Sequence, residues 1–357
     1  MKNFFSGLGT IIALELRQRV RGVAWYVLLG VFFFLVGVVT LAVWVISGTF
    51  QDGLGVGSPL YSSVIYFVLL LGTLVAPALS GNSINGDRDT GTLATTQVTL
   101  VSTAQIILGK FVAAWITALA FLAVAVPFLL FALFRGNVEV STLVISLVVL
   151  ALEVGVVAAI GVGLSGLLTK PILSIVVTYL VVAALSIGTL IAFSLLGLAN
   201  TSEQRSTYTS LDYSGEIDPE TGLPEDLRCL PPQTSTNNIP RFDYFWGVLA
   251  ANPYVLLADA AAPSYSGDEY PADLFGGIQL GARSAQIAPD LDVTYDECEN
   301  PSYYNEGEQP SEIIAKTVPS WFAGLVIHLV LAVVALGGAG FKLRTPARTL
   351  SSGTRIA

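Results

Sequence analysis

Three residues in the apolar parts of this chain could do chemistry. Glu153 is the only carboxylate inside a predicted membrane span, and His328 is the only histidine of the chain. Ser165 lies in the run Gly163–Gly166, which reads Gly-Leu-Ser-Gly. A serine becomes a nucleophile when a base such as histidine lies within hydrogen-bond reach. Ser165 and His328 therefore define a candidate site for an intramembrane serine protease.

Depth in the membrane argues against this protease site. Ser165 lies five residues before Lys170, which places it about 7 Å from that boundary at 1.5 Å per residue. His328 lies twelve residues beyond Lys316, near the middle of its span, so the two side chains are expected at different depths. The glycines that we instead expect to allow close helix packing are Gly161, Gly163 and Gly166.

Glu153 is a candidate functional residue, because an ionised carboxylate at mid-membrane depth costs about 2.5–3.5 kcal/mol on insertion scales. No Lys or Arg occurs at comparable depth in any span, so an intramembrane ion pair is not expected. We expect a neutral or water-facing side chain directed at the bundle interior, either beside a transport pathway or in a structural role. His328 is expected to hydrogen-bond to a backbone carbonyl as a neutral imidazole.

The chain lacks motifs for other chemistry. It contains no G-x-x-x-x-G-K-[ST] and no dinucleotide fingerprint, and no stretch predicts a strand to carry one. One histidine excludes a histidine-cluster metal site. Asp290–Glu299 is acidic but lacks the sixth-position glycine and twelfth-position glutamate of an EF-hand, so we expect a solvated loop. We therefore expect no cofactor and no enzymatic activity on this chain.

Membrane helices must position these residues. The 357 residues are 53% hydrophobic and 12% charged, whereas a soluble domain is about 25% charged. Apolar runs of about 20 residues can cross a bilayer, which predicts an all-α polytopic membrane protein. The six predicted spans are approximately 23–47, 59–79, 111–134, 140–168, 171–198 and 318–342.

Basic residues orient the predicted spans. Short outer loops would hold only Arg135 if both termini were cytoplasmic, as the positive-inside bias favours. Twelve arginines against five lysines suggest a GC-rich bacterial genome, and hence a bacterial plasma membrane. The basic residues that this topology places inside are Lys2, Arg17, Arg19, Arg21, Arg88, Lys110, Lys170, Lys342, Arg344, Arg348 and Arg355.

The N-terminal residues 1–22 predict a helix lying on the inner membrane surface. One face would carry the apolar side chains of Phe5, Leu8, Ile12 and Leu16. A polar face that includes Arg17 would lie opposite, which is typical of interfacial helices. The alternative is an extended first span.

The segment 200–317, between the fifth and sixth spans, is predicted to be an extracellular acidic domain. Residues 203–316 contain twenty acidic and five basic residues, a net charge of −15, which disfavours binding to nucleic acid or anionic lipid. An oxidising outer face would allow Cys229 and Cys298 to form a disulfide, with two free thiols as the alternative. Residues 240–263 predict a helix-turn-helix that re-enters the outer leaflet.

The polar loop at about 81–102 has a distinctive order of residues. Asp87–Asp89 is an acid–Arg–acid group, Gly91–Leu93 reads Gly-Thr-Leu, and Leu108–Lys110 precedes the third span. This order resembles the permease subunits of ABC-2 type transporters. The likeness extends to the basic run Leu14–Gly22, to six spans, and to an Asn-Pro pair in the long loop before the last span.

The resemblance implies a membrane-spanning subunit driven by a separate ATPase, which would carry ATP and Mg²⁺. Two such subunits, identical or related, would line one pathway, in most cases for export of a drug, lipid, peptide or glycan. The family often has a proline where this chain has Thr99–Ser102. A rival is an ATP-powered signalling or protective complex that acts through its outer domain without translocation.

Two groups of residues carry the implied ATPase contact. The loop would form a coupling helix that docks into a cleft of the ATPase, and the basic N-terminal helix would be the connecting helix. The coupling residues would be Asp87, Arg88, Asp89, Thr90, Gly91, Thr92 and Leu93. The connecting-helix residues would be Glu15, Arg17, Arg19 and Arg21. After this helix, the predicted chain continues with the first five spans in 23–199, the last span in 318–342 and a cytosolic tail in 343–357.

Overall fold

Six helices in the described part of the chain are long and apolar enough to cross a membrane, which confirms the predicted multi-pass protein. The computed structural model describes residues 2–50, 57–93, 102–136, 138–214, 228–261, 263–265, 270–299 and 308–343. The spans are α2 (Val23–Phe50), α3 (Gly57–Ser80), α6 (Thr103–Phe134), α7 (Val140–Leu167), the continuous α8–η1–α9 (Pro171–Ala183, Ala184–Gly188, Thr189–Ala199) and α14 (Trp321–Leu343).

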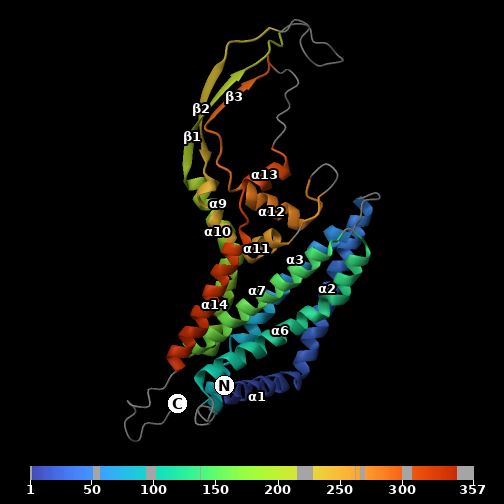
Figure 1. The fold of residues 1–357 in the computed structure, drawn as a ribbon, viewed down its shortest axis with the longest axis vertical. Helices are drawn as coiled ribbons and strands as arrows, with labels where there is room; N and C mark the ends of the chain where they lie inside the picture. The colour runs from blue at the N-terminus through green and yellow to red at the C-terminus, as the bar shows by residue number, and fades with distance from the viewer. Residues whose placement is uncertain are drawn as a thin grey trace.

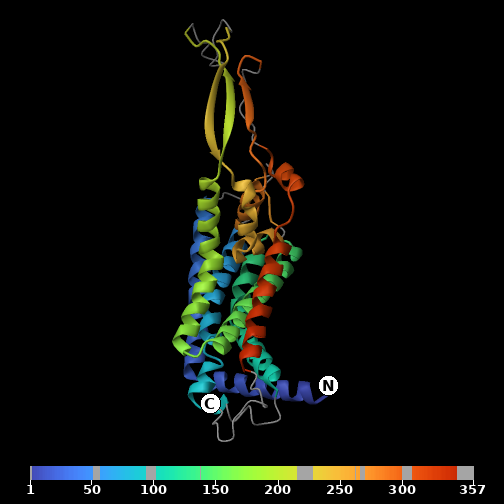
Figure 2. The same ribbon diagram turned by 90° about the vertical axis from the view of Figure 1, so that its left-hand side faces the viewer.

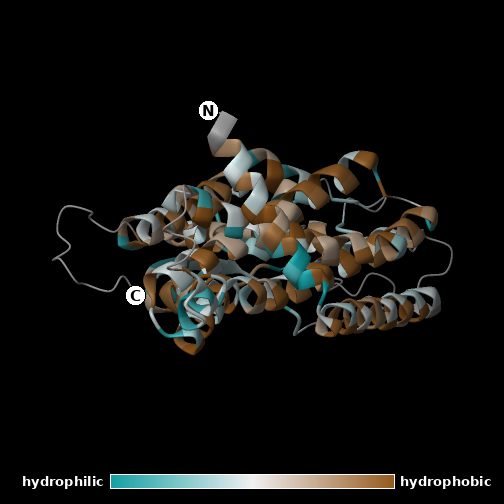
Figure 3. Cartoon of the chain, turned by 90° about the horizontal axis from the view of Figure 1, so that it is seen from below, coloured by the Kyte–Doolittle hydropathy of each residue, from teal (hydrophilic) through white to brown (hydrophobic). Residues whose placement is uncertain are grey.

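The spans pack side by side into one bundle with two different ends (Figures 1 and 2). Helix α1 (Lys2–Val20) crosses one end, and a small sheet projects from the other. We call these the α1 end and the sheet end. Figure 3 shows brown apolar residues along the spans, and many of the exposed ones, such as Phe34 and Val333, lie on helices that would face lipid.

Helix α1 exists as predicted, and part of its predicted apolar face contacts α6. Phe5 is exposed, whereas Leu8 and Ile11 approach Gly109 of α6, where an added Cβ would lie 2.7 Å from Ile11 Cγ2. Glu15 is also buried against α6. The buried face is therefore set by contacts with α6 rather than by the apolar stripe alone.

Helix α6 begins seven residues before Lys110, which the sequence analysis takes as the boundary of the span. Ser102 and Gln105 form a capping box that satisfies the free N–H groups of the first turn. Lys110 then lies inside the helix and is 2% exposed. A buried lysine requires charged partners, which are described below.

Glycines of α7 allow the predicted close packing. A Cβ added at Gly163 would lie 2.5 Å from the Ala335 carbonyl carbon of α14, and one at Gly166 would lie 2.6 Å from Ala339 Cβ. On the side of α3, a Cβ at Gly161 would overlap Ser80. Only glycine fits at these crossings, and the predicted role of the three glycines is confirmed.

The insertion between α9 and α14 contains a three-stranded sheet that the all-α prediction does not include. Strand β1 (Thr201–Thr209) pairs antiparallel with β2 (Gln233–Pro240) and parallel with β3 (Asp292–Asp296). β3 lies within Asp290–Glu299, so the expectation of a solvated loop there is wrong. The strands are rich in Thr, Ser and Tyr, which suit a pleated and half-exposed surface. Cys229 and Cys298 are joined by the predicted disulfide, with Cα atoms 6.0 Å apart.

A helical layer lies between the sheet and the bundle. It contains η2 (Phe242–Tyr244), α10 (Trp246–Ala250), α11 (Pro253–Ala260), α12 (Leu274–Ser284) and α13 (Pro310–Lys316). Helices α10 and α11 form the predicted helix-turn-helix. Its turn residue Asn252 accepts a hydrogen bond from Tyr254 N and donates one to Ser186 O, a carbonyl in the π-helical turn η1 that interrupts the α-helical pattern of the fifth span.

Candidate functional site

The predicted coupling segment forms a short helix, α4 (Asn85–Asp89), at the α1 end of the bundle. Its first turn is held by α7, because Ser165 Oγ accepts hydrogen bonds from Ile84 N at 3.0 Å and Asn85 N at 3.1 Å. Arg88 Nη1 donates to Leu168 O at 3.1 Å. Helix α4 is therefore fixed to the last turn of α7 by buried polar contacts.

A second attachment runs through Lys110 of α6. Its Nζ lies 2.7 Å from Asp87 Oδ2 of α4 and also contacts Glu15 Oε1 of α1. The Lys110 side chain is 3% exposed, whereas Glu15 is 12% and Asp87 33% exposed. We call Glu15, Asp87 and Lys110 the Lys110 cluster. One buried ammonium thus links the predicted connecting helix, the predicted coupling helix and a membrane span.

The rest of the coupling segment faces outward. Asp89, Thr90, Gly91 and Thr92 are exposed, and Gly91 adopts a φ of +73°, which favours glycine. Leu93 is buried and packs in the same apolar cluster as Ile84, Ile106, Ala339 and Leu343. Residues 94–101, the remainder of the predicted coupling loop, lie outside the described residues.

The connecting-helix residues divide in a similar way. Arg17 and Arg21 are exposed, and Arg21 lies just beyond the end of α1. Arg19 is half-buried, with Nη2 4.0 Å from Glu15 Oε2. The α1 end therefore presents exposed groups from α1 and from the turn after α4, with the buried Lys110 cluster between the two segments.

Glu153 and His328 form a pair in the bundle interior that the sequence analysis does not predict. His328 Nδ1 of α14 lies 2.9 Å from both carboxylate oxygens of Glu153 of α7. His328 Nε2 lies 2.9 Å from Ala251 O in the α10–α11 turn. The partner is neither Lys nor Arg, as expected, but the expectation does not include His328 as a hydrogen-bond partner of Glu153. The expected carbonyl partner of His328 is present, and Glu153 faces the interior as predicted.

Proton counting limits the states of this pair. A carbonyl oxygen can only accept a hydrogen bond, so Nε2 of His328 must carry a proton to satisfy Ala251 O. Nδ1 and the Glu153 carboxyl group then need one shared proton to form their hydrogen bond. Removing it would leave a carboxylate facing a nitrogen lone pair, with both side chains at most 2% exposed. In this arrangement Glu153 and Nδ1 of His328 share one proton, in addition to the proton on Nε2, and the pair joins α7, α14 and the α10–α11 turn.

The candidate protease site is not assembled. Ser165 Oγ is engaged by the backbone of α4, and His328 is engaged by Glu153 and Ala251. The two residues point to different partners at different levels of the bundle. Nucleophilic activation of a serine requires the base within hydrogen-bond reach, and this arrangement does not supply it.

A buried charge network near the sheet end is a second feature that the sequence does not predict. Asp259 of α11 lies 2.7 Å from Arg283 Nε of α12, and its other oxygen accepts from Ser320 Oγ at 2.9 Å and Trp321 N at 3.1 Å. Asp259 therefore caps α14 with a negative charge, which the helix dipole favours. The sequence offers no signal for the Arg283 contact, because the two residues are 24 positions apart and lie on different helices.

Comparison with known proteins identifies no family for this chain. No protein-family model matches it, and no curated protein matches it. Within the described ranges, no group of three or more His, Cys, Asp or Glu residues is placed to hold a metal ion.

Proposed function

We propose that this chain is the membrane-spanning subunit of an ABC-2 type exporter, driven by a separate ATPase subunit. The proposal is supported by six apolar helices, by a helix across one end of the bundle, and by a short exposed turn beside that helix. ATP and Mg²⁺ would bind the partner ATPase. A second copy of this chain, or a related one, would complete the pathway.

The Lys110 cluster is the observation that carries the proposal. An ATPase that moves must act on the spans through side chains that join its contact surface to them. Asp87 connects the exposed turn to α6, Ser165 connects the same short helix to α7, and Glu15 connects α1 to α6. A displacement of α4 would therefore reach two spans and the N-terminal helix at once.

The test is the stimulation of ATP hydrolysis in the complex of this chain with its ATPase, reconstituted in lipid nanodiscs. Lys110→Met removes the shared cation, so we expect the membrane subunit to lose most of its stimulation of the ATPase. Lys316→Met is the matched control, because Lys316 pairs with Glu308 at the sheet end and both side chains are exposed. Equal stimulation by wild type and Lys110→Met would reject the proposed coupling route.

A second candidate function is an ATP-powered complex that moves its insertion without translocating a substrate. The contacts of Asp259 with the start of α14 favour it, because they couple the insertion rigidly to a span. ATP-dependent movement of a fluorophore on the sheet, without uptake of any tested drug, lipid, peptide or glycan into proteoliposomes, would support this candidate over the exporter.

A further inference from the structure

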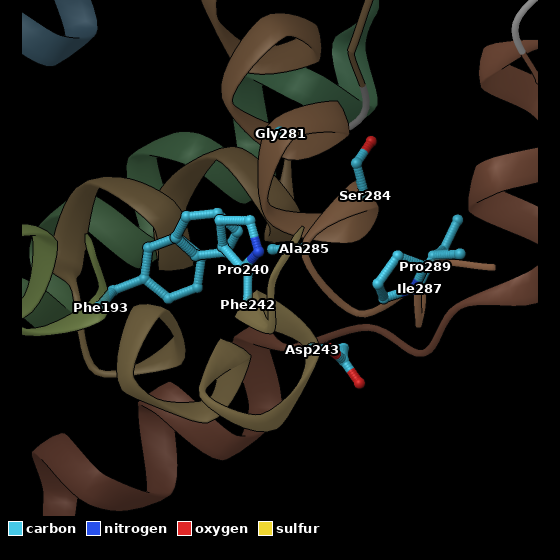
Figure 4. A pocket seen from close by; sticks show the side chains of 9 residues that line it. All are labelled: Phe193, Pro240, Phe242, Asp243, Gly281, Ser284, Ala285, Ile287 and Pro289. Atoms are coloured by element: carbon cyan, nitrogen blue, oxygen red, sulfur yellow. The ribbon is translucent and has the colours of Figure 1, made fainter. Parts of the chain in front are cut away.

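A cavity of about 360 Å³ lies at the sheet end, between α9, η2 and α12. Figure 4 shows Phe193 and Phe242 together on one side and Ile287 and Pro289 on the other, with Ser284 and Asp243 at opposite edges. Its volume is within the range of small-molecule sites. The cavity lies at the opposite end of the bundle from the Lys110 cluster, so binding here can be measured separately from the proposed ATPase contact.

The apolar wall is held in a fixed geometry. The rings of Phe193 and Phe242 have centroids 5.2 Å apart with an interplanar angle of 35°. Phe242 packs directly on Gly197 of α9, where an added Cβ would lie 2.1 Å from Phe242 Cδ1. The backbone N–H of Arg241 also donates to Gly197 O and Asn200 O. Two aromatic faces are therefore presented at the point where the fifth span ends.

A buried carboxylate lies at the edge of this wall. The Asp243 side chain is 7% exposed, and Arg241 donates to it through Nε at 2.8 Å and Nη2 at 2.6 Å. The guanidinium hydrogen bonds lower the pKa of Asp243 below its usual value, so the group stays ionised at neutral pH. A carboxylate offers about four acceptor positions, and Arg241 uses two of them. The ion pair is neutral overall, but Asp243 rather than Arg241 lines the cavity, so the carboxylate is the group that a further donor or cation would meet.

The surroundings favour a positive ligand at the membrane boundary. The insertion that supplies most of the cavity lining, residues 203–316, carries a net charge of −15 over its whole sequence, and a negative net charge raises the local concentration of cations. Aromatic faces attract cations as well. Phe193 lies six residues before the end of α9, about 9 Å along the helix axis, which is the level where amphiphiles have their polar groups in water and their apolar parts in the bilayer.

We propose that this cavity binds a cationic amphiphile, whose apolar part contacts Phe193, Phe242 and Ile287 and whose positive group lies beside Asp243. The aromatic wall and Ile287 supply the apolar contact, and Asp243 distinguishes a cation from an anion of the same shape. The cavity would thus select ligands by charge at the bilayer surface.

Two glycines of α12 provide a matched pair of variants. A Cβ added at Gly281, which lines the cavity, meets no atom within 4 Å, and the same holds at Gly277, one turn earlier on the same helix and outside the cavity lining. Gly281→Trp therefore fills the cavity without a backbone clash. Gly277→Trp adds the same bulk to the same helix at a position where it does not fill the cavity.

The experiment measures binding of radiolabelled decyltrimethylammonium to the full chain in nanodiscs, with empty nanodiscs subtracted. Decyl sulfate, which has the same tail and the opposite charge, is the matched probe. We expect saturable binding of the cation, about tenfold tighter than that of the anion. We expect this binding to be lost in Gly281→Trp and retained in Gly277→Trp.

Several results would overturn the proposal. These are cation binding no greater than in empty nanodiscs, equal affinity for the two probes, or unchanged binding in Gly281→Trp. Asp243→Asn adds a check on the charge: it should reduce the preference for the cation over the anion, and an unchanged preference would remove Asp243 from the site. Lys110→Met should bind the cation like wild type, so a failed ATPase proposal and a failed cavity proposal give different results.

Discussion

The two ends of the bundle hold their buried charges differently. At the α1 end, Lys110 forms ion pairs with the carboxylates of Glu15 and Asp87, and the Asp87 side chain is 33% exposed. At the sheet end, the Asp259 side chain is 0% and the Arg283 side chain 5% exposed, and Asp259 is further satisfied by the start of α14. One arrangement is partly hydrated and shared among three segments, whereas the other is dry and fully bonded.

This difference indicates different mechanical roles. A fully satisfied buried network rigidifies the elements that it joins, so the α11–α12 layer and α14 are expected to move as one unit. A pair with a hydrated member can break and re-form at lower cost, because water replaces the lost contact. The α1 end is therefore the end at which a partner could shift α4 relative to α6 without unfolding the bundle.

The largest expected effect on stability concerns the Asp259–Arg283 pair at the sheet end. Asp259→Ala leaves the Arg283 guanidinium buried without its carboxylate, which costs about 3–5 kcal/mol in the free energy of unfolding. Thermal unfolding of the purified protein should show a large decrease in midpoint. Glu308→Gln, in an exposed pair with Lys316, should leave the midpoint unchanged, and similar midpoints for both variants would remove the contrast between buried and exposed charges.

A smaller effect is expected at the Lys110 cluster. Lys110→Met should destabilise the protein by on the order of 2 kcal/mol, below the buried-pair range because water screens Asp87. Adding Asp87→Asn and Glu15→Gln should recover part of that loss, since no carboxylate is then left without its cation. A double-mutant cycle on unfolding midpoints measures this, and strict additivity would show that the three residues do not interact.

The Glu153–His328 pair should tolerate a neutral partner. Glu153→Gln can still hydrogen-bond to His328 Nδ1, so we expect a change of about 1 kcal/mol and unaltered transport. Glu153→Leu removes the partner and should cost more. Nitrogen-15 NMR of labelled histidine, with infrared detection of the carboxyl group, should find one shared proton. A carboxylate beside a neutral imidazole would contradict the proton count.

The smallest stability effect comes from two glycines with positive φ. Gly91 (φ +73°) and Gly136 (φ +91°) each have open space around an added Cβ. Alanine at either position should cost about 1 kcal/mol through backbone strain alone. Gly91 follows α4, and Gly136 follows α6 at the opposite end. Gly91→Ala alone should therefore reduce ATPase stimulation, and equal effects of both variants would show that strain rather than position matters.

Part of this architecture follows directly from the sequence. Hydropathy locates the six spans, the glycines near Gly163 predict close crossings, and two cysteines in one insertion predict their bond. Such signals are local or involve one unambiguous pair. Charge usually marks the boundary of a span, so the sequence predicts a span that ends at Lys110, and only the folded chain brings Glu15 and Asp87 to this residue.

Other features depend on distant contacts that no local pattern encodes. Glu153 and His328 are 175 residues apart, and each is unremarkable as a single polar residue in an apolar helix. The strand β3 is short and acidic, and it forms because β1 provides a parallel partner. The Arg88 contact with Leu168 O also shows that charge reversal at Arg88 would disturb the attachment of α4 to α7. The exposed Asp89 and Thr90 are better positions for testing a partner, since the hydrogen bonds of the Thr90 hydroxyl lie within its own turn.

The central claim is that the turn after α4 contacts an ATPase, and photo-cross-linking in intact cells tests it most directly. A photoreactive amino acid would replace the exposed Thr90, with the exposed Ser235 on the sheet as the control position. Mass spectrometry of the cross-linked product from Thr90 should identify a protein with a G-x-x-x-x-G-K-[ST] nucleotide-binding loop, and Ser235 should not yield it. If the chain is expressed and inserted but neither position cross-links to such a protein, the account is contradicted.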